Sequence, residues 1–191
     1  MKSDKKNKAS KSLTKVLNEF DSLIKIWAPE DEGYDFLNKG ASDKKLLKLQ
    51  NFLVQNRLPQ DLIEWFKWHD GQDGDDELYC DENCAMSFLS IDESISEMKI
   101  ILKDIKAIYN DPHKKDRKDY PNMPSWKSFW VPIMTSGACE YIMYHFTLGT
   151  LTYYSYDGTV KQVAKSLYDW CDDHVIKLKK QIEGIEIHVE K

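Results

Sequence analysis

Nowhere in the sequence does an apolar run approach the ~20 residues that a membrane-spanning helix needs. The Lys-rich start is not followed by the apolar segment that a secretory signal peptide requires. We therefore expect a cytoplasmic protein that does not act at a membrane. The four cysteines, Cys80, Cys84, Cys139 and Cys171, are then expected to be reduced thiols, although their even number leaves disulfides possible.

Motifs of catalysis are missing as well. The sequence contains no P-loop, no dinucleotide-binding fingerprint and no nucleophile elbow. Cys80 and Cys84 have a spacing that zinc sites allow, but no second Cys or His pair accompanies them. Side chains of adjacent residues on a helix point in different directions, so we interpret His69 as a helix-end residue and Asp70 as a capping or loop contact. We predict no catalytic residue, no cofactor and no metal site.

Acidic residues are concentrated in one part of the chain. The full sequence has 27 basic and 32 acidic residues, a net charge of −5, but residues 61–97 hold twelve acids and one base, a local net charge of −11. Such a field attracts cationic surfaces and repels nucleic acid backbones. A calcium loop that starts at Asp73 would need Gly and Glu where Leu78 and Cys84 stand, so a plain acidic loop is the preferred interpretation.

The composition favours one folded domain. Hydrophobic residues make up 41% of the sequence, and its six Trp and ten Tyr need burial or a partner. We place the domain at residues 12–181, after a basic flexible tail at residues 1–11 and before a C-terminal strand or tail at residues 182–191. Short Lys runs are common solubilising features, so we prefer this role for the tail to one in binding nucleic acid or a membrane.

The centre of the predicted domain is a helix within residues 58–71. Pro59 fits the first helical position, Asp61 favours the positive helix end and Gly71 is expected to close the helix. The apolar side chains leave little polar circumference, which predicts a core helix; they are Leu62, Ile63, Trp65, Phe66 and Trp68. The two tryptophans lie three residues apart on neighbouring rows, which leaves room for one of them at the surface beside the acidic loop.

Hydrophobic periodicity and capping signals predict the other helices. One covers residues 12–27, a second follows a cap at Ser42, a third follows a capping box formed by Ser90 and Glu93, and a last one begins at Ser166. Residues 110–125, rich in Pro and charge, are expected to form a loop.

Short alternating segments predict the strands, which cover residues 84–89, 128–134, 139–146, 150–156 and 159–164. The last four are expected to form an antiparallel meander. Pro132 cannot donate to a ladder, so its strand should lie at a sheet edge or begin near this residue. Together the elements predict an α+β fold, with N-terminal helices and a C-terminal helix packed around an antiparallel sheet of four to six strands.

Two motifs make the chain resemble a known superfamily over residues 42–175. The first is LP-x-DL-x-x-[FWY]-x-x-x-[DN]-G, present as Leu58, Pro59, Asp61, Leu62, Trp65, Asp70 and Gly71. The second has a W-x-P-I strand, a glycine turn and an acidic residue, present as Trp130, Pro132, Ile133, Gly137, Glu140 and Tyr141. The chain thus resembles the SUKH superfamily of Smi/Knr-type domains, which includes fungal cell-wall synthesis regulators and bacterial toxin-immunity proteins. Its turn departs from the usual pattern, with one glycine and a Glu in place of several glycines and an Asp.

The resemblance implies a non-enzymatic, protein-binding domain. The favoured function is that of an immunity protein that binds and neutralises a cognate toxin, and the alternative is an intracellular regulatory module of the cell-wall-synthesis regulator type. The expected partner is a basic protein such as a nuclease domain, without direct contact to nucleic acid.

The predicted residues fall into two sets. Those expected to bind the partner are Trp68, Asp70, Asp73, Asp75, Asp76, Glu77, Asp81, Glu82 and Glu140. Those expected to hold the fold are Leu58, Pro59, Leu62, Phe66, Gly71, Trp130, Pro132, Ile133 and Gly137.

Overall fold

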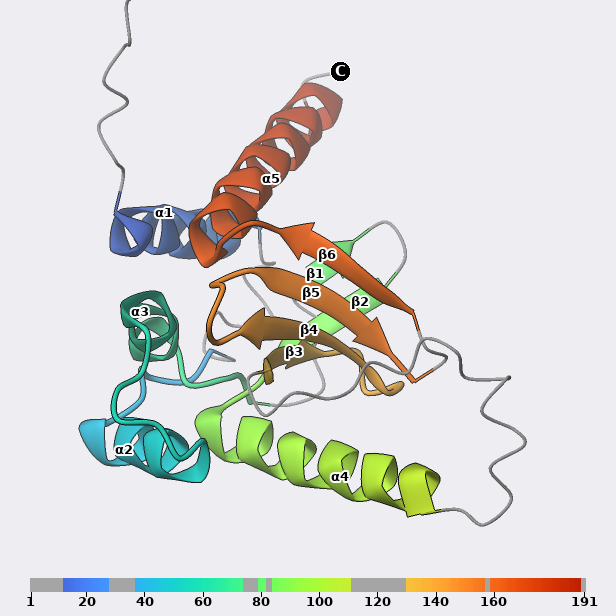
Figure 1. Ribbon diagram of the computed structural model, residues 1–191. Helices are drawn as coiled ribbons and strands as arrows, with labels where there is room; N and C mark the ends of the chain where they lie inside the picture. The colour runs from blue at the N-terminus through green and yellow to red at the C-terminus, as the bar shows by residue number, and fades with distance from the viewer. Residues whose placement is uncertain are drawn as a thin grey trace, which may run out of the picture.

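An antiparallel sheet with helices on both faces forms the framework of the computed structural model, which describes residues 12–27, 37–73, 79–81, 84–110, 130–156 and 159–189 (Figure 1). The helices are α1 (Leu13–Trp27), α2 (Asp43–Phe52), α3 (Gln60–Trp68), α4 (Ile91–Asn110) and α5 (Leu167–Val189). The strands are β1 (Tyr79–Asp81), β2 (Cys84–Phe88), β3 (Trp130–Thr135), β4 (Glu140–His145), β5 (Leu151–Ser155) and β6 (Val160–Ala164). The predicted α+β class is confirmed.

The six strands follow one another in chain order, each antiparallel to the next. This confirms the predicted meander. The prediction missed β1, which lies in the stretch assigned to the acidic loop and pairs with β2. Three residues are too few to show a strand period, so only the pairing with β2 defines this strand.

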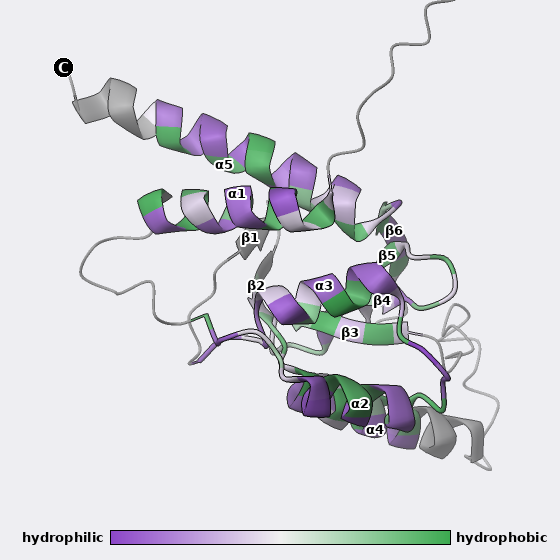
Figure 2. Ribbon diagram, turned by 90° about the vertical axis from the view of Figure 1, so that its left-hand side faces the viewer, coloured by the Kyte–Doolittle hydropathy of each residue, from purple (hydrophilic) through white to green (hydrophobic). Residues whose placement is uncertain are grey.

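Helices cover both faces of the sheet (Figures 1 and 2). In β4, Ile142 and Tyr144 belong to the large core that also includes α1, α3 and α5. Their neighbours Tyr141 and Met143 point to the other face, where they pack with Ile101 of α4. Because both faces are buried, β4 is apolar at consecutive positions instead of alternating with polar residues.

Helix α3 is the predicted core helix. Leu62, Trp65 and Phe66 are buried, and the ring centroid of Trp65 lies 5.4 Å from that of Phe88 in β2 and 5.9 Å from that of Trp170 in α5. The helix therefore connects the sheet with the C-terminal helix.

Both predicted ends of this helix need correction. Pro59 is the N-cap, with an extended ψ of 143°, and is not the first helical residue. The C-cap is His69, so Gly71 does not close the helix. Gly71 is required for a different reason. It has a φ of +80°, and a Cβ atom added there would lie only 2.8 Å from the Cα atom of Ser90, too close to the backbone of that residue.

Three other outcomes concern the sheet and the C-terminus. Pro132 does not lie on an edge strand, because β3 runs between β2 and β4. The strand begins two residues before Pro132, at Trp130. The register of its pairing with β4 shifts between Pro132 and Met134. Residues 182–189 form no strand, because α5 continues to Val189. The basic tail at residues 1–11 and the loop predicted after residue 110 lie outside the described residues.

The first prediction concerns the core. Leu62→Ala should lower the free energy of unfolding by about 2–5 kcal/mol, because the side chain is fully buried in α3 and its removal leaves a cavity. Leu47→Ala, at a position 53% exposed on α2, is the control and should change it by less than about 0.5 kcal/mol. Denaturant unfolding measures both, and equal losses would show that α3 is not core.

A second prediction distinguishes two energetic costs of replacing a glycine: the conformational cost of a positive φ and the cost of a steric clash. Gly137 also has a positive φ, of +73°, but has open space around it, so Gly137→Ala should lose only the conformational cost of about 1–2 kcal/mol. Gly71→Ala adds the clash with Ser90 and should lose about 2–5 kcal/mol in total. Equal losses in denaturant unfolding would contradict the close approach.

Candidate partner-binding site

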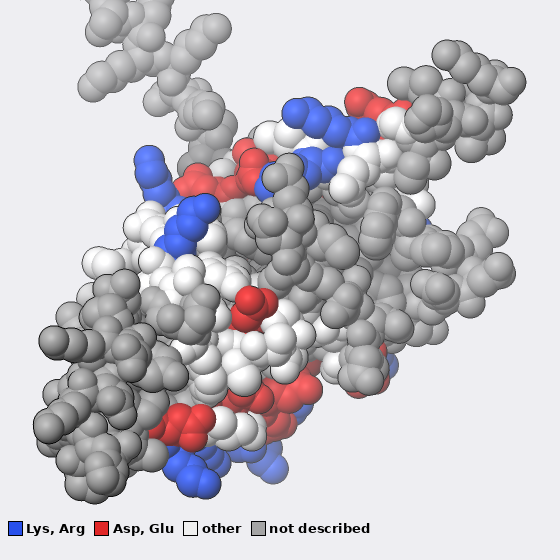
Figure 3. Space-filling view, turned by 90° about the vertical axis from the view of Figure 1, so that its right-hand side faces the viewer, with Lys and Arg blue, Asp and Glu red and all other residues white. Residues whose placement is uncertain are grey.

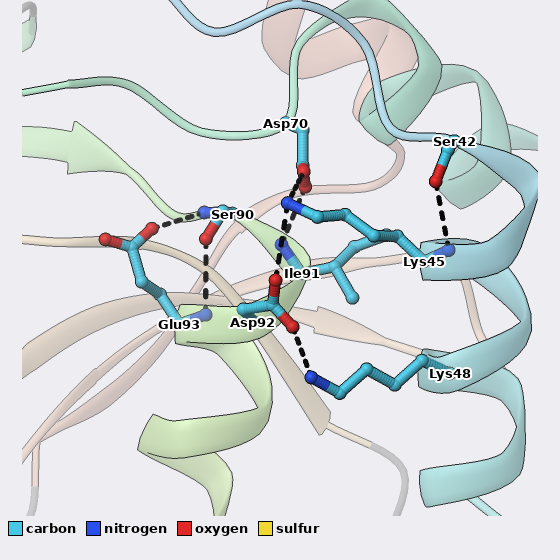
Figure 4. Close-up of polar contacts among 8 residues, drawn as sticks. All are labelled: Ser42, Lys45, Lys48, Asp70, Ser90, Ile91, Asp92 and Glu93. Carbon is cyan, nitrogen blue, oxygen red and sulfur yellow. Dashed lines mark hydrogen bonds and ion pairs between the residues drawn. The ribbon is translucent and has the colours of Figure 1, made fainter.

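The candidate site is centred on Asp70, two residues after α3 (Figure 4). Only 5% of its side chain is exposed. One carboxylate oxygen accepts a hydrogen bond of 2.9 Å from the backbone N–H of Ile91, the first residue of α4, and the other lies 2.5 Å from the ammonium of Lys45 in α2. A single carboxylate thereby connects the end of α3 with the start of α4 and the side of α2.

Lys45 extends this contact into a small ion-pair network. Its ammonium lies 3.3 Å from Asp92, which also pairs with Lys48 (Figure 4). The hydrogen bond from Lys45 to Asp70 raises the pKa of the lysine, and the hydrogen bond from Lys48 lowers the pKa of the Asp92 carboxyl. These pairs hold α2 against the first turn of α4.

Local capping places the first turns of α2 and α4 at this junction. Ser42 is the N-cap of α2 and accepts a hydrogen bond from the backbone N–H of Lys45. At α4 the Ser90 hydroxyl accepts from the N–H of Glu93, and the Glu93 carboxylate accepts from the N–H of Ser90. This confirms the predicted capping box. With the contact from Ile91 to Asp70, side-chain oxygens accept hydrogen bonds from three N–H groups at the start of α4.

The backbone of residues 37–39 runs beside residues 70–72. Leu37 and Gln72 form an antiparallel bridge, the N–H of Asn38 donates to the carbonyl of Gly71, and the N–H of Asp70 donates to the carbonyl of Lys39. The Gln72 side chain accepts a hydrogen bond from the N–H of Phe88 in β2. These bonds fix the chain that leads away from α3.

The side chain of His69 has different partners from the side chain of Asp70. Its Nδ1 lies 2.6 Å from the carbonyl oxygen of Asn38, and its Nε2 lies 3.1 Å from a carboxylate oxygen of Asp21 in α1. The two adjacent side chains therefore form no acid–base pair, and both predictions for them are confirmed: a helix-end residue and a capping contact.

A cleft of about 800 Å³ opens at this junction. Leu37 is the one apolar residue of its lining. The other lining residues are polar or charged: Asn38, Lys39, Lys45, Asp70, Gln72, Asp73, Ser90 and Glu93. Its walls are polar and present both signs of charge to solvent.

The arrangement around Asp70 involves the last two residues of the first motif, Asp70 and Gly71. The sequence profile of the SMI1/KNR4 family (SUKH-1) matches residues 40–173. The chain belongs to this family. A search of the curated proteins found no match.

The first SUKH motif combines core and junction residues. Leu58 and Leu62 are buried in the core, whereas Asp61 at the start of α3 accepts a hydrogen bond of 2.7 Å from the phenol of Tyr144. Burial and this hydrogen bond raise the pKa of the Tyr144 phenol. Asp70 and Gly71 form the junction with α4.

The second SUKH motif lies in β3, β4 and the turn between them. Ile133 is fully buried, and Gly137 supplies a positive φ in the turn. Trp130 is half-buried and packs against the smaller core beneath α4.

Of the residues predicted to bind the partner, Asp70 and Asp73 line the cleft. Glu140 accepts hydrogen bonds from Ser136 and Tyr153. It lies at the opposite end of β4 from Tyr144, the residue that contacts α3. Trp68 is half-buried, with its ring 5.8 Å from those of both Phe20 and Phe88. The side chains of Asp75, Asp76, Glu77, Asp81 and Glu82 lie outside the described part of the structure.

Many of the other acids in residues 61–97 have contacts within the fold. Glu64 accepts hydrogen bonds from Thr14, Glu97 accepts one from Tyr141, and Asp92 pairs with two lysines. Figure 3 shows acidic and basic side chains next to each other along the lower edge of one face. Asp73 is exposed, and no described residue pairs with it.

The sequence-based prediction missed Asn38, Lys39, Lys45 and Gln72 as site residues. Lys45 and Asp70 are 25 positions apart, and neither residue belongs to a spacing that suggests a pair. In the sequence, only the N-cap signal at Ser42 pointed to this region, because it indicates where the helix that carries Lys45 begins.

Metal-binding clusters and membrane-spanning helices are absent from the described residues. No group of three or more His, Cys, Asp or Glu side chains in these residues could hold a metal ion. None of the described helices has the length and apolar character to cross a membrane. Among the described side chains Cys139 and Cys171 are free thiols, and burial raises the pKa of Cys171.

The third prediction tests the Asp70 contacts. Asp70→Ala removes the acceptor for the buried N–H of Ile91 and should lower the free energy of unfolding by about 1–3 kcal/mol. Asp70→Asn keeps an acceptor oxygen and loses the ion pair with Lys45, a residue whose side chain is 39% exposed, so it should cost about 1 kcal/mol or less. Urea unfolding of both variants provides the comparison. A loss in the Asn variant equal to that in the Ala variant would show that charge, and not the hydrogen bond, holds α4.

Proposed function

We propose that this member of the SMI1/KNR4 family is an immunity protein that binds and neutralises a cognate toxin domain. The family is generally non-catalytic, which supports a protein-binding role. The choice of partner rests on one observation: residues 61–97 contain twelve acidic residues and one basic residue.

A basic toxin fits this charge. Nuclease domains that bind phosphate backbones carry basic clefts, and an acidic protein can occupy such a cleft. The attraction accelerates association and weakens as salt screens it. Because several acids of residues 61–97 hold the fold together, the partner would meet mainly Asp73 and the acidic residues that follow it in sequence.

The alternative is an adaptor of the cell-wall-synthesis regulator type. The SUKH superfamily includes both kinds of protein, so identification of the partner is needed to distinguish them. A pull-down from the host at low salt, eluted in rising salt, should yield one basic toxin whose activity this chain suppresses. Recovery of several regulatory proteins without a toxin would favour the adaptor.

The fourth prediction concerns the acidic segment. A variant with Ser at four acids should bind the captured toxin more weakly, with slower association at low salt, because the steering field is reduced. The four positions are Asp73, Asp75, Asp76 and Glu77. Its melting temperature should stay nearly unchanged, since Asp73 is exposed. Calorimetry and surface plasmon resonance measure the two quantities.

A control variant removes three acids elsewhere on the surface. Ser at the exposed positions Asp43, Asp173 and Glu183 should leave toxin binding close to that of the unmodified protein. Intact binding by the acidic-segment variant would show that the partner uses another surface.

A further inference from the structure

The cleft beside Asp70 has the properties of a docking site for a protein segment. Small-molecule sites are lined mainly by apolar and aromatic side chains that bury most of the ligand. Here Leu37 is the one apolar wall residue, and the cleft of about 800 Å³ is polar and open. Such a surface is typical of the polar part of a protein interface, where hydrogen bonds and charges position a partner.

The charges that remain unpaired in the cleft define what it can bind. Asp70 is balanced by Lys45, and Glu93 accepts the N–H of Ser90. Asp73 is exposed on the wall, and none of the described residues pairs with it. Lys39 is likewise exposed and lacks an acidic partner among the described residues. A cation and an anion can therefore each find a charge of opposite sign here.

A free anion such as phosphate does not fit the start of α4. Three of the donors there already have acceptors, because the N–H of Ile91 donates to Asp70, that of Ser90 to Glu93, and that of Glu93 to the Ser90 hydroxyl. The buried Asp70 carboxylate takes the position that a bound anion would need.

We propose that the cleft receives an extended segment of the partner protein, in which a lysine or arginine pairs with Asp73 and a nearby acidic side chain pairs with Lys39. This inference rests on the proposed protein-binding function and adds to it the place and the chemistry of recognition.

The walls are held in place before any partner binds. Asn38 donates to Gly71, Asp70 donates to Lys39, and the backbone of Phe88 donates to the Gln72 side chain. Little ordering is then needed on binding, which reduces its entropic cost. Asp73 is followed in the sequence by the acidic residues 75–77, whose charge would help to steer a basic partner.

The first experiment tests the chemistry without the toxin. The full-length protein, labelled with ¹⁵N, is titrated with the capped peptide Ser-Arg-Ser-Glu-Ser, and the same peptide with Ser in place of Arg is the control. Amide shifts should appear at residues 37–39, 70–73 and 90–93, and should be lost in Asp73→Lys. Shifts elsewhere, shifts that persist in that variant, or no difference between the peptides would overturn the assignment.

The second experiment uses the captured toxin. Asp73→Lys should slow its association about tenfold or more at low salt, and Lys39→Glu should weaken binding as well. Asp173→Lys and Lys161→Glu make the same charge changes at exposed positions of α5 and β6, away from the cleft, and should have little effect. Melting temperatures check that all four variants are folded.

The outcomes separate this inference from the proposed function. If the protein neutralises a toxin and the two cleft variants bind it as tightly as the two controls, the cleft assignment is wrong and the immunity function stands. If no toxin is captured, the immunity function is wrong, and the peptide titration alone decides whether the cleft recognises a basic segment.

Discussion

A buried carboxylate at the end of the central helix connects the parts of this structure that carry its site. Asp70 caps the first turn of α4 and pairs with Lys45 of α2, so three helices are joined within one hydrogen-bonded group. Breaking a contact of this kind leaves a buried donor unsatisfied, which costs more than the contact itself contributes. Gly71 has to follow directly, because the chain passes too close to Ser90 for any side chain. The Asp-Gly pair of the SUKH motif thus has a structural reason that is independent of any partner.

The second constraint is the double burial of the sheet. Strand β4 presents Ile142 and Tyr144 to the core under α1, α3 and α5, and Tyr141 and Met143 to α4. The hydroxyl groups of its two tyrosines donate hydrogen bonds to helix carboxylates, Tyr144 to Asp61 and Tyr141 to Glu97. Acids that appear as a repulsive cluster in the sequence therefore act separately, on opposite sides of the sheet.

This use of acidic residues changes how the charge of the protein is understood. A local net charge of −11 suggests a continuous anionic surface, yet Glu64, Asp70 and Glu97 bind groups of the fold itself. The long-range field remains, since the total charge is unchanged by these contacts. In the proposed complex the short-range contacts would depend on fewer groups, and the exposed Asp73 lines the polar cleft.

The sequence by itself determined the features that arise from neighbours along the chain. Periodicity and caps located α1, α2, α4 and the start of α5, and alternating segments located the four strands of the meander, because these signals act within a few residues. Only the tertiary structure decided the ends of α3, the short strand β1, the extension of α5 and the cleft. Lys45, Asp70 and Ile91 are separated by more than twenty positions, and their contact depends on how α2 and α4 pack. Pairings of that kind leave no local pattern, so the fold class could be predicted, whereas only Asp70 and Asp73 of the predicted partner-binding set lie at the cleft.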